Sequence, residues 1–198
     1  MALREQKKVQ TRDALFNAAV ALFVERGYDG TTMDDIAERA LVSRATAFTY
    51  FPKKEDLLLE WAVRRRQAVS AQSGQAPEER GHPDQIKKVV MALADAYGRD
   101  KAGRAFVVAW LSTGSPLRSE AWVSADVLSE LVRAGQAAHV LRRDVDRQVA
   151  GRLLLNAFLG VLYQWASQSR SAAWLRREVD AELSVILDGL TASVSHLG

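Results

Sequence analysis

Cysteine is absent from this sequence of 198 residues. The absence excludes a disulfide framework and catalysis by a thiol. It also fits a reducing, intracellular compartment, because disulfides form in oxidising ones. The first twelve residues, MALREQKKVQTR, are charged and are not followed by an apolar stretch, so we expect no secretory signal. Together these features predict a cytoplasmic protein.

Long apolar runs are also missing. No stretch approaches the ~20 apolar residues that a membrane-spanning helix needs, and we expect no membrane partner. The excess of positive charge is small, since the chain has 27 Lys and Arg and 24 Asp and Glu, which gives a net charge of +3. Bulk basicity is therefore weak evidence for a nucleic-acid partner, and the placement of the charges has to decide.

Groups that carry catalysis or hold metals are few. The three histidines, His82, His139 and His196, are scattered and share no metal-ligand spacing. The sequence contains neither a glycine-rich phosphate loop nor a G-x-S-x-G motif. Asp34 and Asp35 are adjacent, but neighbouring side chains of a helix point apart, and a solvated face with a cap explains them. We expect no enzyme, no metal and no other cofactor.

Helical patterning dominates what is present. Hydrophobic residues make up 48% of the chain, enough to bury a core, and the alternation typical of strands is missing. We predict an all-α protein of about nine helices. Their expected ranges are 7–26, 32–40, 43–50, 53–72, 84–98, 100–113, 115–138, 146–168 and 173–196.

Short signals mark several of these helix ends. Gly27 follows the first helix, as a glycine just past a helix end should. Thr32 and Asp35 form a capping-box pattern at the start of the second helix. Ser43 is a good N-cap for the third helix, and Pro52 ends it. Asp144 or Asp146 is expected to cap the eighth helix.

Residues 32–50 read as a helix, a tight turn and a short helix with a polar N-terminal end. This is the helix-turn-helix pattern. Slender outward side chains suit a major groove about 12 Å wide, where Arg44 can reach a guanine edge or a phosphate. The hydroxyls of Thr46 and Thr49 can bond phosphates or base edges. Spacing alone leaves the alternative open, because tight turns between helices occur in many proteins that never bind DNA.

Three motifs in this region stand together: F-x-x-x-G-Y-x-x-T-T from Phe23, D-I-A-x-x-A-x-V-S from Asp35, and Y-F-x-x-K-x-x-L from Tyr50. With them, residues 12–60 resemble the N-terminal domain of the tetracycline-repressor (TetR) family. The rest of the chain is similar to that family only in length and helical layout.

The resemblance implies a role for each matching position. The DNA-contacting set would be Thr32, Ser43, Arg44, Ala45, Thr46, Thr49, Tyr50 and Lys54. Within it, Thr32, Tyr50 and Lys54 would hold phosphates while the others face the groove or cap the helix. The residues expected in the core are Phe23, Ile36, Phe48 and Phe51.

Three positions depart from the family pattern. The turn has Leu41 where the family usually has glycine, and a positive φ there would cost roughly 1 kcal/mol or more. Ala45 also replaces a frequent glycine. Phe48 and Thr49 stand where a tyrosine–histidine pair is common. These departures leave the operator sequence unpredictable.

The two C-terminal helices are apolar over more than one stripe, which favours a central position or an interface. The resemblance implies that they pair across a twofold axis, whereas the alternative is an ordinary monomer core. The expected interface residues are Val149, Leu153, Val161, Leu183, Ile186, Leu190 and Val194.

Aromatic residues concentrate in the middle of the C-terminal block. They could fill the core or line a cavity for an apolar or aromatic effector. The family usually has an inducer site in this block. The candidate lining residues are Met91, Tyr97, Phe106, Trp110, Trp122, Phe158 and Trp165.

The expected organisation is therefore a helix-turn-helix DNA-binding domain at 1–52, a connecting helix at 53–72, and a domain for ligand binding and dimerisation at 84–198. Residues 73–83 are rich in Gly, Pro and charge and separate the last two. The expected function is a transcriptional regulator, a ligand-released repressor that binds a palindromic operator as a homodimer. The alternative is a sequence-tolerant, architectural DNA-binding protein without an inducer.

Overall fold

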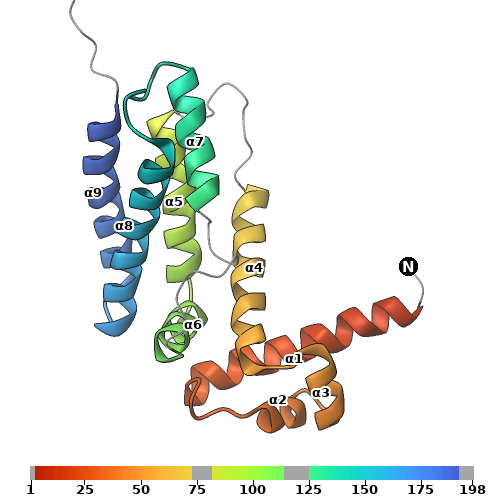
Figure 1. Cartoon of the computed structure of the whole chain (residues 1–198). Coiled ribbons are helices and arrows are strands. Elements are labelled where there is room, and N and C mark those ends of the chain that lie inside the picture. The colour runs from red at the N-terminus through yellow and green to blue at the C-terminus, as the bar shows by residue number, and fades with distance from the viewer. Residues whose placement is uncertain (1–2, 73–81, 114–124, 192–198) are drawn as a thin grey trace, which may run out of the picture. The chain divides into compact units, whose positions relative to one another are not determined.

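The computed structural model describes residues 3–72, 82–113 and 125–191. Within these ranges the chain forms nine α-helices and no strand, which confirms the predicted all-α fold (Figure 1). The helices are α1 (Leu3–Arg26), α2 (Met33–Arg39), α3 (Arg44–Tyr50), α4 (Lys54–Gln72), α5 (Pro83–Gly98), α6 (Lys101–Ser112), α7 (Ala125–Ala137), α8 (Arg147–Ser167) and α9 (Ala172–Leu190). Among the helices of these ranges, none combines the length and the hydropathy of a membrane span.

The chain divides into two compact units. Unit 1 comprises residues 1–64 and 100–121, and unit 2 comprises residues 65–99 and 122–198. Helix α6 therefore groups with the N-terminal helices, whereas the sequence assigned all of 84–198 to one domain. The expected domain limits stay a prediction.

Aromatic packing joins α6 to the N-terminal helices of unit 1. Phe106 on α6 is fully buried. Its ring lies 5.2 Å from that of Phe23 on α1 and is stacked at 4.8 Å on that of Trp61 on α4. Rings at these centroid distances add to the apolar area that they bury. Three segments far apart in the sequence thus share one core.

A network of ion pairs ties α1 to α4 in the same unit. The Glu60 carboxylate accepts hydrogen bonds from Arg12 and from Arg64, each at 2.8 Å. Arg64 also donates to Asp13 at 2.6 Å. The Arg12 guanidinium lies 4.6 Å from the ring centre of Phe51, directly after α3. The network therefore links α1, α4 and the end of α3.

The turn between α2 and α3 is a Schellman turn. The Val42 amide donates to the Ala37 carbonyl and the Leu41 amide to the Glu38 carbonyl, both at 3.0 Å. This motif needs a left-handed residue just past the helix end, a position that glycine usually takes. Leu41 adopts it with φ of 57°, and its side chain is 93% exposed. The φ of Leu41 is therefore positive, which is the case in which the sequence predicts a conformational cost for leucine at this position.

Unit 2 is built from α5, α7, α8 and α9. Helices α7 and α8 approach closely at Gly151, where an added Cβ would lie 2.2 Å from the Ser129 hydroxyl. Lys87 on α5 forms a 2.9 Å ion pair with Asp180 on α9, and Arg176 pairs with Asp95 between the same two helices. Small residues and cross-helix charges thus set the spacing of the bundle.

Most predicted helix ends hold. Thr32, Ser43 and Asp146 are N-caps, and Gly27 has φ of 75° after α1. Three helices begin earlier than expected, α1 at Leu3, α5 at Pro83 and α9 at Ala172. The His82 ring caps α5. The ninth helix was expected to run to 196, but α9 ends at Leu190, and the extended backbone of Thr191 forms its C-cap. The expected start of the seventh helix at 115 lies outside the described residues.

We expect Leu41→Gly to be more stable than Leu41→Ala. Alanine keeps the Cβ that makes the left-handed conformation unfavourable by roughly 1–2 kcal/mol. Glycine releases that strain, although its unfolded-state entropy offsets about 0.4–1 kcal/mol. The expected advantage of glycine in the free energy of unfolding is therefore about 0.5–1 kcal/mol. Denaturant unfolding at one protein concentration measures it, and an alanine variant as stable as the glycine variant would contradict it.

We expect Glu60→Gln to lower stability by about 1–2 kcal/mol at pH 7. Burial would raise the pKa of Glu60, but hydrogen bonds and charges from Arg12 and Arg64 outweigh it and hold this pKa below its ordinary value of 4.5. A depressed folded-state pKa gives stability that is present above the unfolded pKa and is lost as the pH falls through the folded one. The gap between wild type and variant should therefore close below about pH 4.5.

The matched control is Glu130→Gln, which removes an exposed 2.7 Å ion pair with Arg133. Exposed pairs of this kind contribute about 0–1 kcal/mol. Urea melts of both variants from pH 3 to pH 7 make the comparison. A Glu60→Gln loss no larger than that of the control, or one that does not shrink in acid, would refute a stabilising role of the network.

Candidate nucleic-acid interface

Two N-caps fix the start of each helix in the helix-turn-helix. Asp35 N donates to the Thr32 hydroxyl at 3.1 Å, and Thr32 N donates back to the Asp35 carboxylate at 2.8 Å. Thr46 N donates to the Ser43 hydroxyl at 3.1 Å at the start of α3. Each cap satisfies amides that a helix leaves open at its N-terminus. These caps fix the first residue of each helix, Met33 in α2 and Arg44 in α3.

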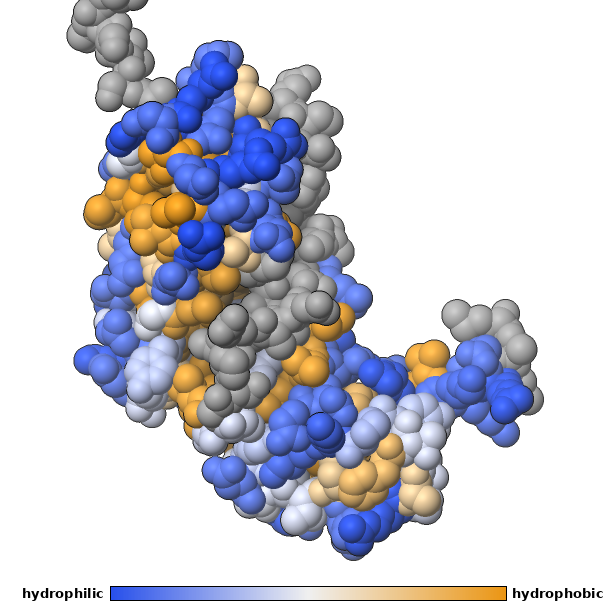
Figure 2. Space-filling model, viewed as in Figure 1, coloured by the Kyte–Doolittle hydropathy of each residue, from blue (hydrophilic) through white to orange (hydrophobic). Residues whose placement is uncertain are grey.

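Helix α3 buries one side and exposes the other. Ala47 is fully buried, and Phe51, directly after the helix, is 1% exposed. The outer side carries four exposed side chains, Arg44, Ala45, Phe48 and Thr49. Figure 2 shows apolar colour among polar residues over the region of α2 and α3. The outer face thus combines one cation, one hydroxyl and apolar groups, which suits base edges and thymine methyl groups.

Phe48 corrects one expectation. The resemblance placed it in the core, but its side chain is 37% exposed and lies on the outer face of α3. The guanidinium of Arg44, one helical turn earlier, lies 5.5 Å from the centre of its ring. A residue four positions away on a helix is a neighbour on the same face. Phe48 therefore supports Arg44 rather than the core.

Arg44 also has a partner on α2. Its Nη1 lies 3.1 Å from Oδ2 of Asp34, and both side chains are more than half exposed. Guanidinium carries five N–H donors in a planar fork, so donors on Nη2 and Nε remain available for a further acceptor. The one arginine of α3 is thus held from two sides at the surface.

Lys54, expected to hold a phosphate, is engaged within the protein. Its Nζ donates to the carbonyls of Tyr28 and Thr31 at 2.6 and 2.8 Å and lies 3.9 Å from the centre of the Tyr28 ring. Burial lowers the pKa of Lys54, while the charges of Asp29 and Glu55 act in the opposite direction. Lys54 therefore fixes the loop that leads into α2, and a phosphate contact stays a prediction.

The hydroxyl groups of the candidate set also have internal partners. Thr49 Oγ1 donates to the Ala45 carbonyl at 2.8 Å, and the Ser43 and Thr46 hydroxyls lie 2.8 Å apart. A hydroxyl has one donor and two acceptor sites, so the Thr46 and Thr49 hydroxyls can still accept from a ligand. Tyr50 is half-buried at the end of α3. The structure brings the candidate DNA-contacting residues together in the helix-turn-helix region, and the DNA role of each residue stays a prediction.

The candidate effector residues fall in both units. Phe106 and Trp110 are buried in α6 of unit 1. Tyr97, Phe158 and Trp165 are buried in unit 2, where the Tyr97 and Phe158 rings meet edge to face at 6.1 Å. The half-buried Met91 lies on α5, and Trp122 lies outside the described residues. Whether these side chains line a cavity stays a prediction.

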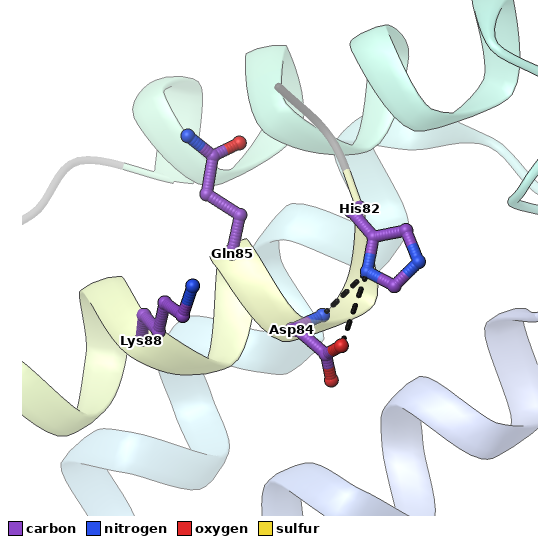
Figure 3. Close-up of a pocket in the computed structure, with 4 residues that line it drawn as sticks. All are labelled: His82, Asp84, Gln85 and Lys88. Carbon is purple, nitrogen blue, oxygen red and sulfur yellow. Dashed lines mark hydrogen bonds and ion pairs between the residues drawn. The ribbon is translucent and has the colours of Figure 1, made fainter. Parts of the chain in front are cut away.

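Three hollows among the described residues are lined by side chains other than these candidates. One, of about 280 Å³, is lined by His82, Asp84, Gln85 and Lys88 at the start of α5. In Figure 3 the His82 ring turns toward Asp84, and its Nδ1 accepts from the Asp84 amide at 3.3 Å. Gln85 and Lys88 point away from that pair. The ring acts as a helix cap, which explains its position without a ligand.

The predicted interface residues differ in exposure. Val161, Leu183 and Leu190 are buried within the chain itself, and Ile186 is half-buried. Val149 and Leu153 on α8 are half exposed. Val194 lies outside the described residues.

Two contributors to the exposed surface were missed from the sequence. Val185 on α9 is 74% exposed, and Figure 2 shows an apolar patch over α8 and α9. Asp34, read as part of a solvated face, pairs with Arg44. The exposure of Val185 could have been predicted from the sequence. Val185 lies four residues after Ala181, and both are on the side of the helix opposite the buried apolar stripe. The pairing of Asp34 depends on how α2 and α3 cross, which no local pattern reports.

Comparison with known proteins gives a consistent answer. The family model described as "Bacterial regulatory proteins, tetR family" matches residues 15–61. The transcriptional repressor KstR of Mycolicibacterium smegmatis is 24% identical, over 93% of this chain and 91% of its own length. A structure of Thermus thermophilus FadR, a TetR family transcriptional repressor in complex with lauroyl-CoA, is 28% identical with a TM-score of 0.67, covering 94% of this chain and 99% of that one.

The fold is shared more widely than the sequence. SmeT, the repressor of the Stenotrophomonas maltophilia multidrug efflux pump SmeDEF, has a TM-score of 0.73 at 20% identity and covers 93% of this chain and 94% of its own. The match to the family model includes α2, the turn and α3, and it covers all three sequence motifs. On these grounds residues 15–61 match the tetR family of bacterial regulatory proteins, and the chain is similar over most of its length to relatives named as transcriptional repressors.

Proposed function

We propose that this protein is a cytoplasmic transcriptional repressor that binds a palindromic operator as a homodimer and is released by a small molecule. The outer face of α3 carries the proposal. It exposes Arg44, Ala45 and Thr49 on a helix whose other side is buried. A helix held in this way can lie in the major groove with its side chains against base edges.

A second copy of the chain is the proposed occupant of the apolar surface on α8 and α9. Val149, Leu153 and Val185 are 50%, 49% and 74% exposed, respectively. Contiguous apolar surface on a soluble protein marks an interaction site. One helix-turn-helix reads few bases, whereas a twofold dimer reads two half-sites about one helical turn apart. The three exposed residues replace the buried Val161, Leu183 and Leu190 as the centre of the proposed interface.

The effector is proposed to be an apolar or aromatic small molecule. The T. thermophilus FadR structure contains lauroyl-CoA, whose acyl chain is apolar. Unit 2 of this chain offers a matching apolar interior, with Tyr97, Phe158 and Trp165 buried in it. Release from DNA requires that the ligand bind the non-DNA-binding state more tightly, and a difference of ~1–3 kcal/mol gives ~5–150-fold weaker operator binding.

The testing experiment is selection of genomic DNA fragments by the purified protein at one fixed salt concentration, followed by sequencing and footprinting. We expect an inverted repeat with half-sites about 10 base pairs apart. Arg44→Ala should weaken binding to it by about 5–150-fold, because a bidentate guanine contact is worth about 1–3 kcal/mol. Binding without any sequence preference would favour the architectural alternative, and no binding would refute the proposal for the protein free of effector.

We expect Leu153→Glu to shift the protein from dimer to monomer, because it places a charge in the centre of an apolar interface. Sedimentation at micromolar concentration reports the oligomeric state. The matched control is Val24→Glu, which changes an apolar side chain of 39% exposure on α1. It should leave the dimer intact. Equal behaviour of the two variants would place the interface elsewhere.

A further inference from the structure

We propose that Asp34 is a positioning residue that holds Arg44 for sequence readout and keeps it from phosphates. The inference rests on the proposed function, since it concerns the same helix-turn-helix, formed by α2 and α3 and called the reading head below. Asp34 lies in the first turn of α2, and Arg44 is the first residue of α3. The ion pair therefore spans the two helices of the helix-turn-helix at 3.1 Å between Oδ2 and Nη1.

The position of the pair is that of a functional contact rather than a stabilising one. The side chains of Arg44 and Asp34 are 71% and 55% exposed, and exposed pairs contribute little to folding. The start of α2 does not need Asp34 as a cap, because Asp35 already forms the capping box with Thr32. Asp34 is thus free of the structural task that its neighbour performs.

Phe48 restrains the same guanidinium from the α3 side. The Arg44 guanidinium carbon lies 5.5 Å from the ring centre, within the range of a cation–π contact. An arginine side chain that is fixed before binding loses less conformational entropy when it binds. The carboxylate on one side and the ring on the other therefore limit the directions in which Arg44 can point.

The chemistry of the remaining donors matches guanine. Asp34 engages Nη1, so Nη2 and Nε form the available edge of the fork. Guanine presents two acceptors, O6 and N7, in the major groove, whereas adenine presents one acceptor and one donor. Two fixed parallel donors can therefore bond both acceptors of guanine. Against adenine, one of the two donors would face the N6 amino group, which is itself a donor. The restraint thus makes Arg44 discriminate guanine from adenine, which a freely moving cation would not do.

The negative charge of Asp34 acts on phosphates as well. A freely moving arginine would bind the phosphates of any DNA sequence, which adds affinity without discrimination. A carboxylate beside the guanidinium cancels much of that attraction and repels phosphate. Specificity is a difference of affinities, so weaker binding to all other sequences raises it.

The test measures affinity and discrimination separately in the full-length protein. The selected operator and versions of it with each guanine changed to adenine are titrated at one salt concentration by fluorescence anisotropy. Arg44→Ala identifies the guanine that Arg44 reads, as the position where discrimination disappears. At that position Asp34→Ala should lower discrimination at least about threefold while raising affinity for unrelated DNA.

Glu38→Ala is the matched control. Glu38 is an exposed acid one turn further along α2 and forms no ion pair with Arg44. Removing it changes the net charge of the head by the same amount, so affinity for unrelated DNA should rise in a similar way. Discrimination at the guanine should stay at the wild-type value. A structural or purely electrostatic role of Asp34 would give the same result for both variants.

A double variant completes the cycle. In the Arg44→Ala background, Asp34→Ala should no longer change discrimination, because the residue that it positions is gone. Unchanged discrimination in the single Asp34→Ala variant, with loss in Arg44→Ala, overturns the inference and leaves the proposed function intact. Failure to select any operator refutes both, and full discrimination in Arg44→Ala overturns the inference alone.

Discussion

The short helix α3 has to be held by its buried side, and much of unit 1 is arranged to do so. A helix of seven residues is about two turns long and does not persist alone in water. Its inner side is anchored by Ala47 and by Phe51 directly after it, both buried. The Ser43 cap fixes its start, and Arg12 over the Phe51 ring restrains its end. The outer side is thereby left for recognition.

Most polar groups near the interface first serve the fold. Lys54 closes the loop before α2, and Glu60 joins α1 to α4 through two arginines. The Thr46 hydroxyl bonds to the N-cap Ser43, and the Thr49 hydroxyl bonds to the Ala45 carbonyl within α3. Such contacts fix the angle at which a recognition helix is presented, and that angle matters because a groove about 12 Å wide tolerates little tilt. Rigidity of the head and its chemistry are therefore built from the same residues.

Local chemistry made much of this predictable from the sequence. Thr32, Ser43 and Asp146 are caps because short acceptor side chains satisfy open amides, and such signals extend over only three residues. The sequence also marked Leu41, which stands where the family usually has glycine, as costly if its φ is positive, and that φ is 57°. The three helix-turn-helix motifs also lie close together in the sequence, so the reading head could be recognised without a structure.

What the sequence did not predict depends on contacts between distant segments. Phe48 was expected in the core, yet the crossing of α2 and α3 leaves it at the surface beside Arg44. The contact of Phe106 on α6 with Phe23 and Trp61 was not predicted either, and the expected domain limits stay a prediction. An apolar stripe reports that a face is buried and not which partner buries it. The same limit applies to Val161 and Leu183, which are buried within the chain and whose place at an interface stays a prediction.

The low net charge of +3 fits the role proposed for the Asp34–Arg44 pair, because both limit non-specific attraction to DNA. A strongly basic head would bind any DNA through released counterions, and the many non-specific sites of a genome would then compete with the operator. The reading head here carries exposed Asp29, Asp34 and Glu38 close to its cations. These acids lower affinity for all sequences alike, so the contrast between sites has to come from base contacts. A head with one restrained arginine and several nearby acids is suited to discrimination more than to tight binding.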